Sequence, residues 1–227
     1  MRWPGFPPQP FVDEAVLGRL RDVPVAVLAD AMDRSNILSA SVRHVSGPAR
    51  LCGRALTVLA APGDNRTVFQ ALDVAQPGDV LVVSAGGDGG GTALVGEFVA
   101  LEAARRGIAG AVVDGYVRDH ADLPSSLPVY ARGAQPRGPS RAAQGRIGWP
   151  VAVGGVAVLW GDVVVADGEG VAVVPAPAAA AVAAEAERRL AAEAATRRRL
   201  DAGEPLTRIL GVDPYPHPLP DRGRGET

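Results

Sequence analysis

The sequence predicts an α/β fold built on a mixed sheet, and three observations support this prediction. Short β-branched runs bounded by Gly or Pro alternate with helical patterns between residues 55 and 113. Val-rich runs with short connections follow between residues 151 and 174, as is typical of antiparallel hairpins. The alanine-rich stretch 178–202 then predicts a long helix.

The first elements are two short helices and a strand. The residues from Phe11 to about Leu20 have an amphipathic helical pattern, and a second helix is expected over Pro24–Met32, with the proline near its first turn. The run Ala55–Ala61 is rich in β-branched and apolar residues and ends at the turn Pro62-Gly63, so it predicts a buried strand.

Two further strand–helix units are expected in the middle of the chain. A helix starts near Arg66 and leads to the strand Val80–Val83, and the next helix is predicted over Thr92–Arg106. Strands are then expected at Ala111–Val113 and Pro128–Tyr130, with a loop over 132–146. The predicted apolar faces are Val68, Ala71, Leu72 and Ala75 in the first helix and Leu94, Val95, Phe98 and Leu101 in the second.

The chain of 227 residues is long enough to bury one substantial core. We expect an N-terminal arm over 1–14, a single domain over 15–205 and a disordered, proline-rich tail over 206–227. The net charge of -2 argues against a nucleic-acid partner. The sequence has no signal-peptide or membrane-span pattern and a single cysteine, Cys52, which together predict a cytoplasmic protein.

The composition excludes several kinds of chemistry. All 23 basic residues are arginines, so no lysine amine is available for a Schiff base or for pyridoxal phosphate. The three histidines, at 44, 120 and 217, have no metal-ligand spacing. A bound metal would therefore have carboxylate ligands, which hard ions such as Mg²⁺ or Mn²⁺ prefer.

A glycine-rich segment, Gly86–Gly91, lies between a predicted strand and a predicted helix. Such a loop can bind anions, and Asp114 at the end of the next strand could imitate the ribose-binding acid of a dinucleotide site. The glycines do not have the G-x-G-x-x-G spacing, so a flexible loop without a ligand is also a valid interpretation. The turn residues Asp64 and Asn65 have two interpretations as well: they only shape the turn, or they also face a site.

A more specific pattern consists of Glu97, twenty residues, and then Arg118-Asp119. The guanidinium of Arg118 suits a substrate carboxylate, and Asp119 offers an oxygen ligand for a divalent ion. The opposing interpretation is that Arg118 and Asp119 only pair with neighbours at the surface.

Together with GDVLVV, the upstream PGDN and the downstream DGEGVAVVP, this pattern resembles the RraA-like family. That family includes the 4-hydroxy-4-methyl-2-oxoglutarate/4-carboxy-4-hydroxy-2-oxoadipate aldolases, and the resemblance covers roughly residues 15–205. It implies a three-layer β/β/α sandwich of the swivelling-domain type, assembled as homotrimers or dimers of trimers with sites between subunits. It also implies a 2-oxoacid substrate and a Mg²⁺ or Mn²⁺ cofactor.

The resemblance also implies roles for particular residues. Arg118 would bind the pyruvyl group, and Asp119 would be the direct protein ligand of the metal. Glu97 stands where we expect Asp in the characterised aldolases. The implied substrate-binding backbone lies within Gly89, Gly90, Gly91 and Gly96, together with Glu97. A neighbouring subunit would contribute a glutamate from the C-terminal helix, with Glu193 as first candidate and Glu187 as second.

The implied activity is retro-aldol cleavage of a 4-hydroxy-2-oxoacid to pyruvate and a second carbonyl compound, without a covalent intermediate. Decarboxylation of oxaloacetate is the implied side activity, because it passes through the same enolate. The same family also contains proteins that bind ribonuclease E and inhibit RNA decay. A non-enzymatic regulator is therefore the alternative function.

Overall fold

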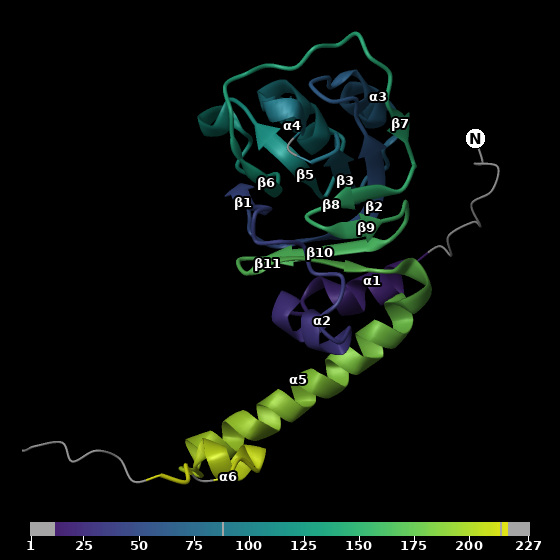
Figure 1. The fold of residues 1–227 in the computed structure, drawn as a ribbon. Coiled ribbons are helices and arrows are strands. Elements are labelled where there is room, and N and C mark those ends of the chain that lie inside the picture. Colours follow the sequence, from purple (N-terminus) through teal and green to yellow (C-terminus); the bar gives the residue numbers. More distant parts are fainter. Residues whose placement is uncertain (1–11, 88, 214, 218–227) are drawn as a thin grey trace, which may run out of the picture. The chain divides into compact units, whose positions relative to one another are not determined.

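The computed structural model describes residues 12–87, 89–213 and 215–217, and the chain divides into two compact units, Met1–Glu187 and Arg188–Thr227. A nine-stranded mixed sheet forms the centre of the first unit (Figure 1). Its main path runs β1-β6-β5-β3-β2-β10-β11, β4 pairs with β5, and β7 pairs with β2. These strands are β1 Arg43–Ser46, β2 Leu51–Leu59, β3 Asp79–Ser84, β4 Ala93–Val95, β5 Gly110–Val117, β6 Val129–Ala134, β7 Arg146–Ile147, β10 Val163–Asp167 and β11 Gly170–Val174.

The described elements also include a separate hairpin and six α-helices. The hairpin consists of β8 Val151–Val153 and β9 Val156–Val158. The helices are α1 Glu14–Arg21, α2 Val25–Ala31, α3 Arg66–Val74, α4 Glu97–Arg105, α5 Ala179–Asp201 and α6 Leu206–Leu210. Three short 3₁₀ turns are also present, at Gly89–Gly91, His120–Asp122 and Ala176–Ala178.

The central strands β2, β3, β5 and β6 are parallel, so their carboxyl ends lie at one edge of the sheet. One face of the sheet packs against α3 and α4, with Val83, Val113 and Val99 among the buried side chains. The other face packs against the β8–β9 hairpin through residues such as Val82 and Val153. These layers confirm the predicted α/β fold with a mixed sheet.

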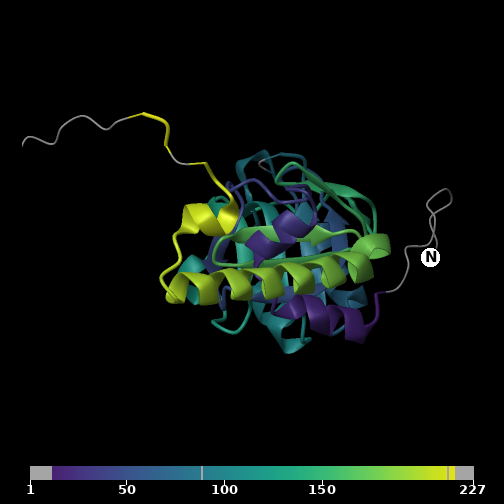
Figure 2. The same cartoon turned by 90° about the horizontal axis from the view of Figure 1, so that it is seen from below.

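The two N-terminal helices begin close to the predicted positions. The Asp13 side chain caps α1 by accepting a hydrogen bond from the Val16 N–H at 2.8 Å, and Pro24 precedes the first residue of α2. Figure 2, seen from below, shows these helices in purple on the side of β10 and β11. The Asp167 carboxylate at the end of β10 accepts a hydrogen bond from the Val25 N–H at 2.8 Å, which attaches the start of α2 to the sheet.

The predicted helix over Thr92–Arg106 needs a correction. Its first residues form strand β4, and α4 starts only at Glu97. Gly96 between them is fully extended, with φ -134° and ψ -173°, and the strand is held by hydrogen bonds to β5 and by the Ala93 N–H bond to Arg137 O. The predicted apolar face was wrong for Phe98 and Leu101, which are 74% and 44% exposed. Shifting the helix start moves the buried face to Val99, Ala100 and Ala103.

Other differences involve non-local pairing. Strand β6 continues to Ala134, inside the segment predicted as a loop, because it pairs with β5 along its length. Strands β1 and β7 were not predicted; β7 has only two residues and exists through its pairing with β2. The predicted N-terminal arm lies largely outside the described residues.

The second unit contains the end of α5 and the short helix α6. The predicted disordered tail is corrected at its start, because Leu206–Leu210 form α6 and Gly211 ends it in the left-handed conformation with φ 65°. Leu206 and Leu210 are 49% and 59% exposed. Among the described helices, none combines the length and the apolar character that a membrane span requires.

Candidate functional site

The pairing of β4 with β5 brings the two halves of the Glu97 and Arg118-Asp119 pattern together. Val95 pairs with Val117, and the Arg118 N–H donates a hydrogen bond to Val95 O at 3.0 Å. Gly96 therefore lies beside Arg118, although the two residues are far apart in the sequence. The start of α4 and the end of β5 form one location at the carboxyl edge of the parallel strands, where α/β proteins place their sites.

Arg118 and Asp119 are paired with each other but remain accessible. Arg118 Nε donates a hydrogen bond to Asp119 Oδ2 at 3.0 Å, and the two side chains are 43% and 35% exposed. Among the described residues, the Arg118 Nη groups donate no hydrogen bond. The guanidinium thus has terminal N–H donors left for a planar anionic group.

Two glycines make room for the Arg118 side chain. A Cβ at Gly96 would lie 2.8 Å from Arg118 Cγ and 3.0 Å from Asp119 Oδ2. A Cβ at Gly138 would lie 2.8 Å from Arg118 Nη1. The arginine is therefore confined between the start of α4 and the loop that follows β6. Gly138 was not among the predicted site residues, because nothing in its local sequence shows which side chain lies against it.

Asp119 has an unusual backbone conformation. Its φ of 54° and ψ of 41° lie in the left-handed region, which Asp and Asn adopt more readily than most residues. The chain turns there into the 3₁₀ turn His120–Asp122. The imidazole of His120 is held by the backbone, because its Nε2 lies 3.0 Å from Val45 O. This contact favours a structural role for His120 over a catalytic one.

Glu97 is the first residue of α4. Its side chain is half-buried, and within the described part of the chain it has no hydrogen-bond or ion-pair partner. The first N–H groups of an α-helix have no intrahelical acceptor and carry partial positive charge. The preceding Gly96 offers no side-chain cap. The start of α4 therefore combines a carboxylate available as a base with N–H groups available to substrate oxygens.

The glycine-rich segment packs against the turn after β2. Gly90 and Gly91 have positive φ values of 71° and 65°, and a Cβ at Gly90 would lie 3.2 Å from the Gly63 N. Gly89 and Gly90 belong to the same 3₁₀ turn. Residue 90 is thus restricted to glycine for two reasons: its backbone is left-handed, and it lies close to Gly63.

The turn residues Asp64 and Asn65 do more than shape their own turn. The Asp64 carboxylate accepts hydrogen bonds from the N–H groups of Arg66, Ala142 and Ala143 at 2.7–3.0 Å. Asn65 Nδ2 donates to Leu94 O at 3.2 Å, and its Oδ1 is buried without a partner among the described residues. This turn therefore contacts both β4 and the loop after β6.

Asp114 has a structural role that argues against a ribose site. The residue is 4% exposed, and its carboxylate accepts hydrogen bonds from Arg132 Nε at 2.7 Å and from the Gly154 N–H at 3.3 Å. A carboxylate that is already paired and buried is not available to a nucleotide. The dinucleotide interpretation of the glycine segment therefore loses its acidic partner.

The two C-terminal glutamates lie in different units. Glu187 closes the first unit and accepts two hydrogen bonds from Arg19, at 2.7 and 2.8 Å. That arginine lowers the pKa of Glu187 through the hydrogen bond. Glu193 lies on α5 within the second unit. Its assignment to a neighbouring subunit's site stays a prediction.

The donor set restricts which metal could bind. No group of three or more His, Cys, Asp or Glu side chains with metal-binding geometry occurs in the described part of the chain. Asp119 offers an accessible carboxylate next to Arg118. Mg²⁺ is commonly held by one or two carboxylates while substrate and water supply the other ligands. The site therefore fits a hard divalent ion and does not fit a structural zinc ion.

The family model described as RraA-like, Aldolase/RraA, matches residues 25–173. The chain belongs to the RraA-like family. A relative from Halalkalibacterium halodurans, named "Putative 4-hydroxy-4-methyl-2-oxoglutarate aldolase", is 34% identical over 80% of this chain and 87% of its own length. A Thermus thermophilus protein named "4-hydroxy-4-methyl-2-oxoglutarate aldolase" is 35% identical over 65% of this chain and 90% of its own length.

A solved structure adds a second kind of relative. Streptomyces coelicolor RraAS2, described as an unusual member of the RNase ES inhibitor RraA protein family, is 30% identical and has a TM-score of 0.73. The match covers 82% of this chain and 98% of that one. The predicted family and fold class are thereby confirmed.

Proposed function

We propose that this protein is a divalent-metal-dependent aldolase that cleaves a 4-hydroxy-2-oxoacid to pyruvate and a second carbonyl compound. The observation that carries the proposal is the position of Arg118, whose terminal N–H groups are unpaired in the described residues beside the accessible carboxylate of Asp119. The aldolase names of the relatives support the same reaction class.

The residues of the site match the charges that develop in a retro-aldol cleavage. Arg118 binds the pyruvyl carboxylate and places positive charge near the enolate oxygen, which stabilises the transition state. The N–H groups at the start of α4 orient the remaining substrate oxygens. Glu97, which has no charged partner among the described residues, accepts the proton of the 4-hydroxyl group as the carbon–carbon bond breaks.

Asp119 is the proposed protein ligand of a Mg²⁺ or Mn²⁺ ion. When bound, such an ion supplies a Lewis-acid charge near the 2-oxo group. The absence of lysine is consistent with this assignment, because the chain has no lysine amine with which to form an imine in place of the enolate. The hydrogen bond from Arg118 Nε to Oδ2, at 3.0 Å, also restricts rotation of the Asp119 carboxylate.

The same chemistry predicts an oxaloacetate decarboxylase side activity. Loss of carbon dioxide from oxaloacetate leaves its electron pair on the pyruvate enolate, which a proton then quenches. Arg118 would stabilise this enolate as it does in the aldol cleavage. Oxaloacetate is therefore a suitable first substrate, because the assay does not depend on the side chain of the natural 2-oxoacid.

The decisive experiment follows pyruvate release from oxaloacetate and from a panel of 4-hydroxy-2-oxoacids, with Mg²⁺ or Mn²⁺ and with EDTA. We expect metal-dependent release that falls at least about 100-fold in Arg118→Ala and in Asp119→Ala. Glu169→Gln, in the exposed turn between β10 and β11, is the matched control and retains activity. Release that is indifferent to EDTA and to both substitutions contradicts the proposal.

The alternative function is regulation of ribonuclease E by protein binding. It is favoured by the described role of the RraAS2 relative and by a second structure, the RNA-processing inhibitor RraA from Thermus, which is 34% identical. A pull-down with purified ribonuclease E, run beside the pyruvate assay, separates the two functions. Ribonuclease binding that survives Arg118→Ala, without pyruvate release by the wild type, would select the regulator.

We further propose that the protein acts as a homotrimer or a dimer of trimers in which Glu193 completes a neighbouring subunit's site. Support comes from the large exposed apolar side chains of Phe98 and Leu101 on α4, adjacent to Glu97 in sequence. Light scattering after size exclusion measures the mass. A monomer with full activity, or a Glu193→Gln variant with unchanged activity, would contradict this assembly.

A further inference from the structure

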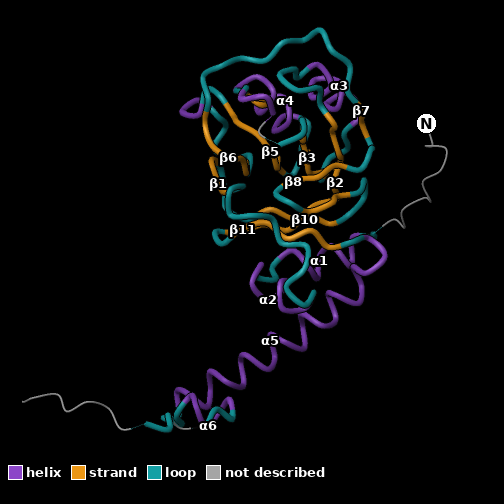
Figure 3. The backbone as a smooth tube through the Cα atoms, viewed as in Figure 1, coloured by secondary structure: helices purple, strands orange, loops and turns teal. Residues whose placement is uncertain are grey.

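The loop between β6 and β7, residues 135–145, is attached to the site edge along its length. We call it the strap, and Figure 3 shows it in teal, running from β6 past α4 and α3 to β7. Near its start, Arg137 O accepts a hydrogen bond from the Ala93 N–H at 2.9 Å. Near its end, the Gly145 N–H donates to Thr67 Oγ1 at 2.7 Å. The strap therefore connects β4, which leads to Glu97, with the first turn of α3.

The middle of the strap pairs with the turn after β2. The Ser140 N–H donates to Gly63 O at 2.8 Å, and the Asn65 N–H donates to Ser140 O at 3.0 Å. Two residues further on, the N–H groups of Ala142 and Ala143 both donate to Asp64 Oδ2, at 2.7 and 3.0 Å. Asp64 thus fixes the part of the strap that follows Gly138.

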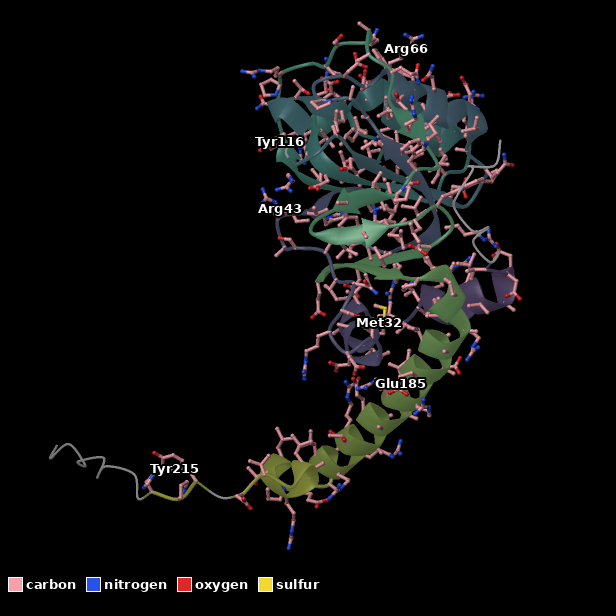
Figure 4. All side chains as sticks on the ribbon, turned by 45° about the vertical axis from the view of Figure 1, so that its right-hand side comes forward. Met32, Arg43, Arg66, Tyr116, Glu185 and Tyr215 are labelled. Carbon is pink, nitrogen blue, oxygen red and sulfur yellow. The ribbon has the colours of Figure 1, made fainter. Side chains whose placement is uncertain are left out.

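The Asp64 carboxylate is well suited to this role. It is 3% exposed, and its second oxygen, Oδ1, accepts the N–H of Arg66 at 2.8 Å, which ties the strap to the start of α3. Burial acts to raise the pKa of Asp64, but the backbone N–H groups and the Ser140 hydroxyl outweigh burial and hold the pKa below its ordinary value. Figure 4 labels Arg66 next to the strap.

The strap also borders the substrate-binding arginine. Gly138 comes so close to Arg118 that a Cβ there would be 2.8 Å from Nη1. Arg118 is confined on its opposite side by Gly96. A displacement of the strap at residue 138 would therefore open space beside the guanidinium. The guanidinium could then rotate out of the orientation in which its terminal N–H groups face a substrate.

We propose that Asp64 is a positioning residue of the site: it holds the strap against Arg118 and so fixes the orientation of the guanidinium that binds the substrate carboxylate. This inference rests on the proposed function. Asp64 acts through Ala142, Ala143 and Gly138 and does not contact the substrate itself. This role explains why a turn that is remote from Arg118 in sequence contains a buried carboxylate.

The first test measures the strap directly with trypsin. Arg137 and Arg141 are exposed strap residues whose peptide bonds trypsin can cut, and peptide mapping by mass spectrometry follows each bond separately. Asp64→Asn keeps the shape of the side chain but replaces one acceptor oxygen by an NH₂ group and removes the charge. We expect cleavage after both arginines to accelerate at least about tenfold relative to the wild type, because local opening exposes the bond. Glu169→Gln serves as the control.

The second test measures substrate binding. For oxaloacetate, Asp64→Asn should raise KM about tenfold and lower kcat less, and the inhibition constant of pyruvate should rise by the same factor, because a misplaced Arg118 binds both carboxylates poorly. Gly138→Ala changes the contact between the strap and Arg118 directly, because its methyl group displaces the guanidinium. It should reproduce the rise in KM without faster cleavage by trypsin. This second variant keeps the proposal testable if Asp64→Asn does not fold.

The outcomes are distinguishable. Unchanged cleavage of the strap in Asp64→Asn overturns the proposal, and so does faster cleavage with an unchanged KM. If Asp64→Asn does not fold, an unchanged KM in Gly138→Ala overturns the proposal. If the wild type releases no pyruvate, the proposed function fails, whereas the trypsin experiment still decides whether Asp64 holds the strap.

Discussion

Gly96 lies directly against Arg118: a Cβ at residue 96 would stand 2.8 Å from Arg118 Cγ. The contact arises because β4 pairs with β5, so that residues far apart in the chain become neighbours. It means that a residue without a side chain determines where the arginine can be. The site is therefore sensitive to volume at 96 as well as to charge at 118.

Replacement of Gly96 by Ala should impair substrate binding without unfolding the protein. Its φ of -134° and ψ of -173° are accessible to alanine, so the backbone is not strained, and the new methyl group displaces Arg118. We expect kcat/KM for pyruvate formation to fall at least about tenfold, with a small change in Tm. Gly18→Ala is the matched control, since a Cβ there has nothing within 4 Å and the residue is exposed on α1. Equal activity of Gly96→Ala and wild type would refute the prediction.

The two substitutions Glu97→Gln and Glu97→Asp should have different effects. Removing the charge removes the proposed base, and kcat should fall about 100-fold, within the range that general-base catalysis contributes. Shortening the side chain by one methylene retains the charge, and the fall should be much smaller. Steady-state kinetics with a 4-hydroxy-2-oxoacid gives both values. If Glu97→Gln retains activity while Glu97→Asp loses it, the length of the side chain matters rather than its charge, and Glu97 is not the base.

Asp119→Asn should weaken metal binding while the fold is retained. Asparagine tolerates the left-handed backbone at this position but lacks the negative charge that a hard ion requires. We expect the concentration of Mn²⁺ at half-maximal activity to rise at least about tenfold. Calorimetric titration of the protein with Mn²⁺ checks binding independently of activity, and Asp122→Asn, three residues later on the surface, is the control. Identical titrations for wild type and Asp119→Asn would exclude this ligand.

The Glu102 cluster on α4 predicts a pH-dependent stability. Hydrogen bonds from Arg105 and Arg106 lower the pKa of Glu102 from 4.5 to about 2. Because the folded pKa is depressed, the stabilisation is present above pH 4.5 and is lost as the pH falls towards 2. The wild type should therefore have a higher urea midpoint than Glu102→Gln at about pH 7, and the difference should shrink as the pH falls below the unfolded pKa. A difference that is constant with pH would contradict this.

The local sequence was sufficient where an element depends on its own residues. The parallel strands, α3 and the long helix α5 were predicted because their apolar periodicity and their glycine or proline boundaries are local properties. Glu97, Arg118 and Asp119 were selected as candidate site residues for the same reason: they form a spaced pattern in the chain. Their proximity follows once β4 and β5 are paired.

The local sequence was insufficient where pairing between distant segments decides the conformation. Residues Ala93–Val95 have a helical pattern, yet they form a strand because β5 and Arg137 supply hydrogen-bond partners. The attachment of the strap to Asp64 depends on a contact across 78 residues. Asp64 and Asn65 were identified as turn residues from the sequence. Whether Asp64 has a role beyond the turn depends on those distant contacts.

Asp119 illustrates how two independent requirements can select one amino acid. Its left-handed backbone, with φ 54° and ψ 41°, is cheap for Gly, Asn and Asp and costs most other residues about 1–2 kcal/mol. The proposed role as a metal ligand, by contrast, requires a negatively charged oxygen and restricts the choice to Asp and Glu. Only aspartate belongs to both sets. Among the proposed site residues this position should therefore tolerate the fewest substitutions in a saturation library, and even glutamate, which retains the charge, should be depleted there.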